Sequence, residues 1–476
     1  MSSDKLFSSY NSGNVWKMCL NASLGSFIFG YNIGVFSSTQ DPVISSIGWE
    51  SDSEYYTSML GSLMPFGAMI SAVFAGPISN RIGKRRTIMI SNLVTLLGAG
   101  VISIPFIYTF AIGRFVTGLG VGFYAVLVPL YINETSPTEM SGKVGALVQF
   151  QVTLGIVVPS LLALILPTGN YGSNSLTYLW IGIYALQGPI AMVQLLLFFK
   201  VYKLETPGWL WGKNFREDAL ESLKQVYSEE SAQEELEKLD SAYNQDKELT
   251  SSFISEEKSK DPSYIELLFC KQGTGKLMRL GWANNLVQQF SGINAIIFYS
   301  TTIFKHLIGG GTFMSRVYAV ILNTVNMASA FAGIPIVNKF GRKSVMIVGC
   351  IGMAACLFLS GLLAGPLSSW PSFLSLISLL LYIVFFEISI GPICWIYCGE
   401  IMTSRGMSIC IALNWLCNTI VTFTFLLLRE QYNISVAFWI YAGICAVGVI
   451  YFWLDMVETK SLNKQEIQGL FMKKRS

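Results

Sequence analysis

The sequence predicts an all-α membrane protein in which twelve transmembrane helices form two six-helix halves, with a cytoplasmic helical segment between them. Three observations predict this fold class: the composition, a series of long apolar runs and a repeated set of charged motifs. Hydrophobic residues make up 52% of the 476-residue chain and charged residues only 13%, against about 25% charged residues in soluble domains. With a mean hydropathy of +0.51, the chain favours lipid as its solvent, which excludes a disordered protein, a nucleic-acid binder and most soluble enzymes.

The apolar runs are long enough for transmembrane helices, because a helix crosses the hydrocarbon core with about 20 residues. Strands of a closed barrel would instead alternate over about 10 residues. The first run follows a polar leader without a small-residue cleavage site, so we expect a retained span and not a signal peptide. The expected spans are 15–37, 57–79, 87–108, 110–132, 144–167, 178–202, 277–303, 313–337, 344–366, 372–400, 407–428 and 433–454.

The charges of the loops predict the orientation in the membrane. The stretch 38–56 contains four acids (among them Glu50 and Asp52) and neither Lys nor Arg, whereas 81–86 contains four basic residues and the chain ends in Lys473-Lys474-Arg475. Basic loops thus alternate with acidic or neutral ones, and basic loops stay in the cytoplasm. We therefore expect both termini to be cytoplasmic.

These patterns divide the chain into five regions. Between the sixth and seventh spans, Leu220, Leu223 and Val226, followed by a second apolar set, have helical spacing and predict short amphipathic helices. A plain solvated linker is the alternative. The expected regions are a cytoplasmic N-terminus (1–14), an N-terminal six-helix half (15–203), a cytoplasmic helical linker (204–276), a C-terminal six-helix half (277–455) and a cytoplasmic tail (456–476).

The two halves repeat the same charged motifs. Arg81-Ile82-Gly83-Lys84-Arg85 follows the second span, and Lys339-Phe340-Gly341-Arg342-Lys343 follows the eighth. Acids repeat as well, since Glu134 and Glu400 end the fourth and tenth spans, and Glu205 and Glu458 follow the sixth and twelfth. Basic loops that serve topology alone would leave the matching acids unexplained. Two halves of like topology, with a site between them at mid-membrane, are typical of alternating-access carriers.

The repeated charges also suggest a conformational lock. We expect Arg85 and Arg86 to pair with Glu134 and Glu205, and Arg342 and Lys343 to pair with Glu400 and Glu458. Partly desolvated ion pairs bias a conformation by a few kcal/mol, whereas exposed pairs contribute about 0–1 kcal/mol. Pairs that form when the cytoplasmic side is shut would hold the outward-open state.

The polar residues inside the spans are mostly amides, which offer both donors and acceptors. They suit a neutral ligand rich in hydroxyl groups, although any single one could join helices instead. A charged substrate would need counter-ions, and few ionisable candidates exist within the spans, Arg114 and Glu387 among them. The aromatic Trp395 and Trp415 provide flat faces of the kind that stack on sugars. The amides are Asn32, Gln149, Gln288, Gln289, Asn294, Asn326, Asn414 and Asn418.

Two further features bear on function. Gly292 and Gly391-Pro392 lie where the seventh and tenth spans can break and bend. The nine cysteines show no ligand spacing and the chain has a single histidine, His306, so we expect no metal, no cofactor and no enzymatic activity.

These motifs together resemble the sugar porter family of the major facilitator superfamily, over nearly the whole chain and in the family's order. The strings that carry the resemblance are Gly30-Tyr31-Asn32, Gly113-Arg114-Phe115, Glu134-Thr135-Ser136-Pro137, Glu205-Thr206-Pro207, Gln288-Gln289-Phe290-Ser291-Gly292-Ile293-Asn294, Gly391-Pro392-Ile393-Cys394-Trp395, Asn414-Trp415 and Glu458-Thr459-Lys460, with the two basic loops given above.

The resemblance implies roles for individual residues. The family's hexose contacts correspond to Gln149, Gln288, Gln289, Asn294, Asn326, Trp395 and Asn414, further lining positions to Phe386, Glu387, Trp415 and Asn418, and the extracellular gate to Tyr299. Two family arginines are replaced by Ser141 and Gly208, so the network is thinner in the N-terminal half. The loop from Glu400 to Met407 is about four residues shorter than in the family, so the register of Asn414 depends on a gap.

The resemblance also bears on the transport class. Proton-coupled relatives place an Asp in the slot of Asn32, beside Arg114, and an amide there has no proton to exchange. We therefore expect a facilitative hexose uniporter, with D-glucose as the first candidate substrate, which works by alternating access as a monomer in the plasma membrane. The alternatives are a proton-coupled symporter, in which Glu387 is the ionisable candidate, and a sugar sensor, although sensors often carry longer tails. Fructose, pentoses and polyols remain open as substrates.

Overall fold

The computed structural model describes residues 10–48, 53–169, 175–252, 264–270, 275–309, 311–402 and 404–460. Several features named above lie outside these ranges: Glu50 and Asp52, the basic tail from Lys473, and parts of the expected N-terminus, linker and tail.

The first six expected spans correspond to seven helices. The sixth span is interrupted at Leu186, so that two shorter helices follow each other. These helices are α1 (Ser12–Ile47), α2 (Ser53–Ile82), α3 (Lys84–Ile102), α4 (Ile107–Thr135), α5 (Ser141–Leu162), α6 (Leu179–Ala185) and α7 (Gln187–Lys200).

The last six spans are formed by nine helices, because the seventh and tenth spans are interrupted. The seventh consists of α12 (Gly275–Phe290), α13 (Ile293–Phe298) and α14 (Ser300–Leu307), and the tenth of α17 (Phe373–Ile388) and α18 (Ile390–Ile401). The others are α15 (Gly311–Phe340), α16 (Arg342–Ala364), α19 (Ser404–Gln431) and α20 (Ile434–Asp455). Between the two sets lie α8 (Pro207–Gly212), α9 (Arg216–Lys224), α10 (Glu229–Ser252) and α11 (Tyr264–Leu268).

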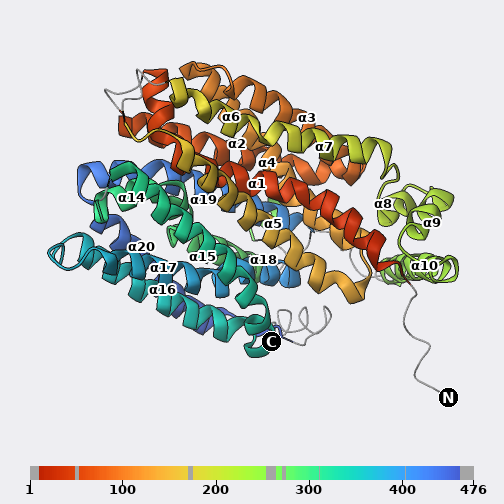
Figure 1. Ribbon diagram of the computed structural model, residues 1–476. Coiled ribbons are helices and arrows are strands. Elements are labelled where there is room, and N and C mark those ends of the chain that lie inside the picture. Colours follow the sequence, from red (N-terminus) through yellow and green to blue (C-terminus); the bar gives the residue numbers. More distant parts are fainter. Residues whose placement is uncertain are drawn as a thin grey trace.

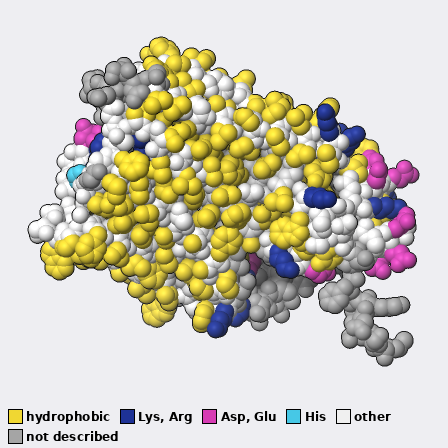
Figure 2. All heavy atoms as spheres, in the orientation of Figure 1, with side chains coloured by type: hydrophobic (Ala, Val, Ile, Leu, Met, Phe, Trp, Pro, Cys, Tyr) yellow, Lys and Arg dark blue, Asp and Glu magenta, His cyan; other side chains and the backbone are white. Residues whose placement is uncertain are grey.

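The predicted all-helical membrane architecture is confirmed. Among the described residues, ten helical segments are long and apolar enough to cross a membrane, and Figure 2 shows apolar side chains over most of the face in view. The two expected spans outside this set are α3, which begins with three basic residues, and α12–α14, which is interrupted and carries several amides. Both lie among the other membrane helices.

The helices form two groups that lie side by side (Figure 1). Within the first group α2 packs on α4 and α1 packs on α5, and within the second α16 packs on α20 and on α17. The two groups, here called the N-half and the C-half, meet along α2 with α19 and along α5 with α15. We call the end of the bundle that carries α8–α10 the terminal side, and the opposite end, with α14, the distal side.

The contact between α1 and α5 depends on glycine. Gly30 and Gly34 of α1 face the main chain of α5 at Val152 and Ile156, and Gly155 of α5 in turn faces the main chain of α1. A Cβ atom at Gly30 would overlap the carbonyl oxygen of Val152. Small residues let membrane helices approach this closely, and close packing replaces the hydrophobic effect as the attraction between them.

We expect Gly30→Val to destabilise the protein by at least about 1–3 kcal/mol, because the added methyl groups overpack a contact between two main chains. A lower midpoint of thermal unfolding in detergent would show this. Gly100→Val in α3 is the control, since nothing lies within 4 Å of a Cβ atom at that glycine. Equal midpoints for the two variants would contradict the packing argument.

Candidate functional site

In both halves a glutamate caps the first turn of a helix, α3 in the N-half and α16 in the C-half. The carboxylate of Glu205 accepts from the main-chain N–H of Arg85 (3.1 Å) and Arg86 (2.8 Å). Likewise, Glu458 accepts from the main-chain N–H of Arg342 (2.9 Å) and Lys343 (3.0 Å). The first N–H groups of a helix have no partner within the helix and carry a partial positive charge, so a carboxylate there is favourable.

Each capped helix is preceded by a glycine that the cap requires. Gly83 and Gly341 have φ angles of 99° and 87°, and a Cβ atom on either would overlap the capping carboxylate. Burial raises the pKa of the Glu205 carboxyl, although its three main-chain hydrogen bonds lower it. The repeated Gly-and-acid motif of the sequence is therefore a pair of equivalent helix caps.

The ion pairs beside these caps differ in part from those expected. Glu134 pairs with the ammonium group of Lys84 (2.7 Å), and not with Arg85 or Arg86. The guanidinium group of Arg85 instead donates to the carbonyl oxygen of Phe198 (2.8 Å), near the end of α7. Arg85 is buried and reaches this carbonyl group, which has no partner within the helix, whereas the side chain of Arg86 is exposed.

In the C-half, one expected pair is present. Arg342 binds Glu400 (2.7 Å), while Lys343 donates its ammonium group to the carbonyl oxygen of Trp453 and only its main-chain N–H to Glu458. Every one of these contacts joins helices of the same half. The expected role of the network in closing the terminal side therefore stays a prediction, and any such role would act through the positions of helices within a half.

The predicted binding amides of α12, α13 and α19 form one hydrogen-bonded chain. Asn294 Nδ2 donates to Gln289 Oε1 (2.6 Å), and Gln289 Nε2 donates to Asn414 Oδ1 (2.7 Å). Asn414 Nδ2 then donates to Gln288 Oε1 (2.6 Å). The interruption at Gly292 (φ 88°) places the end of α12 and the start of α13 side by side. Asn414 of α19 lies beside both glutamines of α12.

The tenth span is interrupted earlier than expected. The break lies at Ser389, with φ −119° and ψ −99°, and Gly391-Pro392 falls in the first turn of α18, where proline is tolerated. Gln288 Nε2 donates to the carbonyl oxygens of Ile390 (3.3 Å) and Gly391 (3.1 Å) in this turn. The amide chain is thus anchored at the interruption of the tenth span.

A second polar group, centred on Glu387, connects the two halves. Glu387 of α17 accepts from Asn326 Nδ2 of α15 (2.9 Å) and from Gln149 Nε2 of α5 (3.5 Å). Two buried atoms of the predicted lining residues, Asn326 Oδ1 and Trp415 Nε1, have no hydrogen-bond partner among the described residues, and the same holds for Asn32 Oδ1 in the coupling slot. One acceptor and one donor of the lining residues therefore remain free to bind a ligand.

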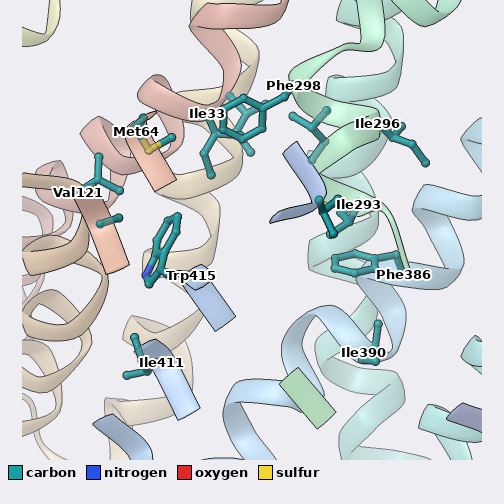
Figure 3. Close-up of a cluster of buried hydrophobic side chains, with 14 of the residues drawn as sticks. Ile33, Met64, Val121, Ile293, Ile296, Phe298, Phe386, Ile390, Ile411 and Trp415 are labelled. Atoms are coloured by element: carbon teal, nitrogen blue, oxygen red, sulfur yellow. The ribbon is translucent and has the colours of Figure 1, made fainter. Parts of the chain in front are cut away.

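Aromatic and aliphatic side chains surround these polar groups. Figure 3 shows Trp415 close to Met64 and Val121 of the N-half, and Phe386 beside Ile293. The ring of Trp415 lies 5.5 Å from that of Phe29 on α1.

Trp395 and Asn418, which are also predicted to line the site, join neither of these two polar groups through any contact recorded for the described residues. Trp395 is 37% exposed on α18. Asn418 accepts from Thr422 within α19.

Arg114 and Asn32 lie together, as the sequence predicts for the coupling slot. Arg114 is fully buried and donates to the main-chain carbonyl oxygens of Asn32 (3.2 Å) and Leu60 (3.4 Å), with its guanidinium group 5.0 Å from the ring centre of Phe36. Asn32 donates its side-chain amide to Gln187 Oε1 (2.8 Å). No ion pair is recorded for Arg114 in the described part of the chain.

Hydrogen bonds join the two halves on the distal side. Ser37 of α1 binds Ser300 (2.8 Å) and accepts from the main-chain N–H of Thr301 (3.1 Å). Tyr299, the predicted gate, is fully buried between α13 and α14, and its hydroxyl donates to the carbonyl oxygen of Thr422 (2.8 Å). The centres of its ring and of the Phe36 ring are 6.3 Å apart, and the two rings meet edge to face.

Two ion pairs, which sequence reasoning missed, join the halves further out. Lys305 of α14 lies 3.6 Å from Asp41 of α1, and Arg429 of α19 binds Glu54 of α2. These residues line a cavity of about 620 Å³ at the distal mouth. The partners are hundreds of residues apart, and no repeated motif marks them. We call the pairs Asp41–Lys305 and Glu54–Arg429 the distal ion pairs.

We expect Arg429→Gln to favour opening of the distal side, by up to about fivefold in population, because a partly exposed ion pair contributes about 0–1 kcal/mol. Spin labels at the exposed Tyr55 and Tyr432 would report the separation of α2 from the C-half by double electron–electron resonance. Arg216→Gln, which breaks an exposed ion pair between α9 and α10, is the control. An unchanged distance distribution in the Arg429 variant would show that the pair does not hold this side closed.

Comparison with known proteins identifies the family. The model of the family described as "Sugar (and other) transporter" matches residues 18–471. The facilitated glucose transporter member 2 of solute carrier family 2 from Sus scrofa is 28% identical and aligns with 96% of this chain and 93% of its own length. Hexose transporter 1 of Plasmodium yoelii yoelii is 29% identical (93% and 89%), and the D-xylose-proton symporter of Escherichia coli K12 is 25% identical (97% and 96%).

Solved structures agree with this result. A proton:xylose symporter of the major facilitator superfamily, bound to 6-bromo-6-deoxy-D-glucose, superposes with a TM-score of 0.78 at 25% identity, over 97% of this chain and 100% of that one. An inward-open xylose transporter from E. coli has the same fold, with a TM-score of 0.76 at 24% identity over 96% and 99% of the two chains. The chain is therefore a multi-pass membrane transporter and not an enzyme, and it belongs to the sugar transporter family of the major facilitator superfamily.

Proposed function

We propose that the protein is a facilitative hexose uniporter, with D-glucose as its substrate. The chain of four amides beside a free acceptor on Asn326 and a free donor on Trp415 carries this proposal. A hexose presents hydroxyl groups that donate and accept, and it carries no charge that would need a counter-ion. The similar glucose and hexose transporters support a hexose, while relatives of like identity are named for xylose, inositol or trehalose.

The environment of Arg114 supports uniport. Its guanidinium group binds main-chain carbonyls, and the neighbouring Asn32 is an amide whose side chain is already bound to Gln187. Neither carbonyls nor amides titrate near physiological pH, so this group offers no site at which a proton could be released during the transport cycle.

Transport would follow alternating access between the two halves. We propose that the terminal side is cytoplasmic, with both termini there, and that the distal side faces outward from the plasma membrane. The distal hydrogen bonds and ion pairs then form the closed outer gate, with Tyr299 beneath it. The caps and ion pairs of the terminal side would hold the helices of each half together, so that each half moves as a unit when the inner side closes. A single chain contains both halves, so we propose a monomeric transport unit.

Proton-coupled symport is the second candidate, because one observation favours it. Glu387 is a buried carboxylate at mid-membrane, bound to Asn326 of its own half and to Gln149 of the other. A carboxyl group that joins two moving halves changes its hydrogen bonds as they separate, and such a change is what couples a proton to transport.

We expect Gln288→Ala and Asn294→Ala each to weaken glucose binding by about 0.5–1.5 kcal/mol, or about two- to tenfold in affinity, because each removes a hydrogen-bonding amide from the chain. Equilibrium binding of glucose to the purified protein would measure this. Gln194→Ala removes a buried amide that donates to the main chain of α1, away from the chain of amides, and should leave the affinity unchanged. Unchanged affinity in both test variants would remove these residues from the site.

We expect sugar uptake into liposomes to follow the sugar gradient alone and to vary little between about pH 5.5 and 7.5, because Asn32 does not titrate. Liposomes with equal glucose on both sides and an inward proton gradient provide the test. Net accumulation that a protonophore abolishes would establish symport, and its loss in Glu387→Gln would identify the coupling group. Binding of glucose without uptake would instead indicate a sensor.

A further inference from the structure

Asn285 of α12 is hydrogen-bonded to the predicted sugar-binding amides. It is one turn of α12 before Gln288 and Gln289 and is 1% exposed. Its Oδ1 atom accepts from Asn414 Nδ2 (2.9 Å), and its Nδ2 atom donates to the carbonyl oxygen of Gly281 (2.8 Å). Asn285 is therefore bonded to a residue of the amide chain and to its own helix.

Two thiols of α18 hold the same side chain. The Cys394 thiol donates to Asn285 Oδ1 (3.5 Å), and Asn285 Nδ2 donates to Cys398 Sγ (3.6 Å). Thiols are weak hydrogen-bonding partners. Both thiol contacts nevertheless require the same assignment of Oδ1 and Nδ2 as the stronger bonds to Asn414 and Gly281. The orientation of Asn285 is thus determined by α12 and α18 together.

The orientation of Asn285 decides that of Asn414. The two hydrogens of Asn414 Nδ2 are taken by Asn285 Oδ1 and Gln288 Oε1 (2.6 Å), which leaves Asn414 Oδ1 to accept from Gln289 Nε2 (2.7 Å). If the Asn414 amide turned by half a rotation, its oxygen would face two oxygens and its nitrogen would face a donor. Asn285 supplies one of the two acceptors that prevent this.

We propose that Asn285 is a positioning residue for sugar binding, which fixes the Asn414 amide in the orientation that the sugar meets. This inference rests on the proposed function. Asn285 has no role in the lock, the coupling slot or the gate described above, and its contribution to binding acts through Asn414.

The chain offers a matched control in the neighbouring residue. Asn284 is the same residue type with the same 1% exposure, and it also contacts α18, where it donates to the carbonyl oxygen of Cys394 (3.1 Å) and to Cys398 Sγ (3.6 Å). None of its recorded bonds among the described residues reaches the amide chain. A merely structural role for a buried amide at this place would therefore affect both variants alike.

The test compares glucose uptake by Asn285→Ala and Asn284→Ala in liposomes. We expect Asn285→Ala to raise KM about tenfold while kcat stays within about twofold, because a binding interaction is weakened and the moving parts are unchanged. Asn284→Ala should leave KM within about twofold of the native value. Equal KM changes in the two variants, or no change in either, would overturn the proposal.

A double-mutant cycle distinguishes positioning from general destabilisation. In an Asn414→Ala background, Asn285→Ala should change glucose affinity by less than about twofold, since the residue it positions is gone. A full tenfold effect in that background would contradict the proposal. Affinities are measured by equilibrium glucose binding in detergent, alongside unfolding midpoints, so that a poorly folded variant is recognised and Asn285→Ser replaces it. If the native protein neither binds nor carries glucose, the proposed function fails. If the native protein transports glucose and Asn285→Ala leaves KM unchanged, only the inference about Asn285 fails.

Discussion

Within an apolar bundle, every polar group must find its partner inside the protein, and this constraint shapes most of the structure. The buried amides of α12, α13 and α19 bind one another. Arg114, without a carboxylate beside it, donates to two main-chain carbonyls. The interruption at Gly292 follows the same rule, because it brings Gln289 and Asn294 within reach of each other.

The same constraint explains the internal repeat. A helix that begins at the membrane surface presents N–H groups without partners, and both halves satisfy them with an acid from a distant loop, Glu205 in one and Glu458 in the other. The capping carboxylate occupies the space of a Cβ atom, so glycine must precede each helix. The repeated motifs therefore reflect the geometry of the two helix caps as well as the charges of their residues.

Contacts between the halves differ from contacts within them. Within a half, polar groups are joined by short bonds between adjacent helices. Between the halves, Glu387 binds Gln149 at 3.5 Å near the centre, and the remaining polar contacts described above cluster on the distal side. A carrier needs such a division, because bonds within a half persist through the cycle and bonds between halves must form and break.

The sequence by itself determined the helical membrane architecture, since apolar runs of about 20 residues have few other stable forms. It also determined which residues cluster, because Gln288, Gln289 and Asn294 are close in the chain and repeated motifs marked Glu205 and Glu458. Only the tertiary structure decided the partners: that Lys84 and not Arg85 binds Glu134, that Asn285 holds Asn414, and that Glu54 meets Arg429. Hydrogen bonds between distant helices depend on helix rotation and tilt to within about an ångström, and a one-dimensional pattern carries no information at that scale.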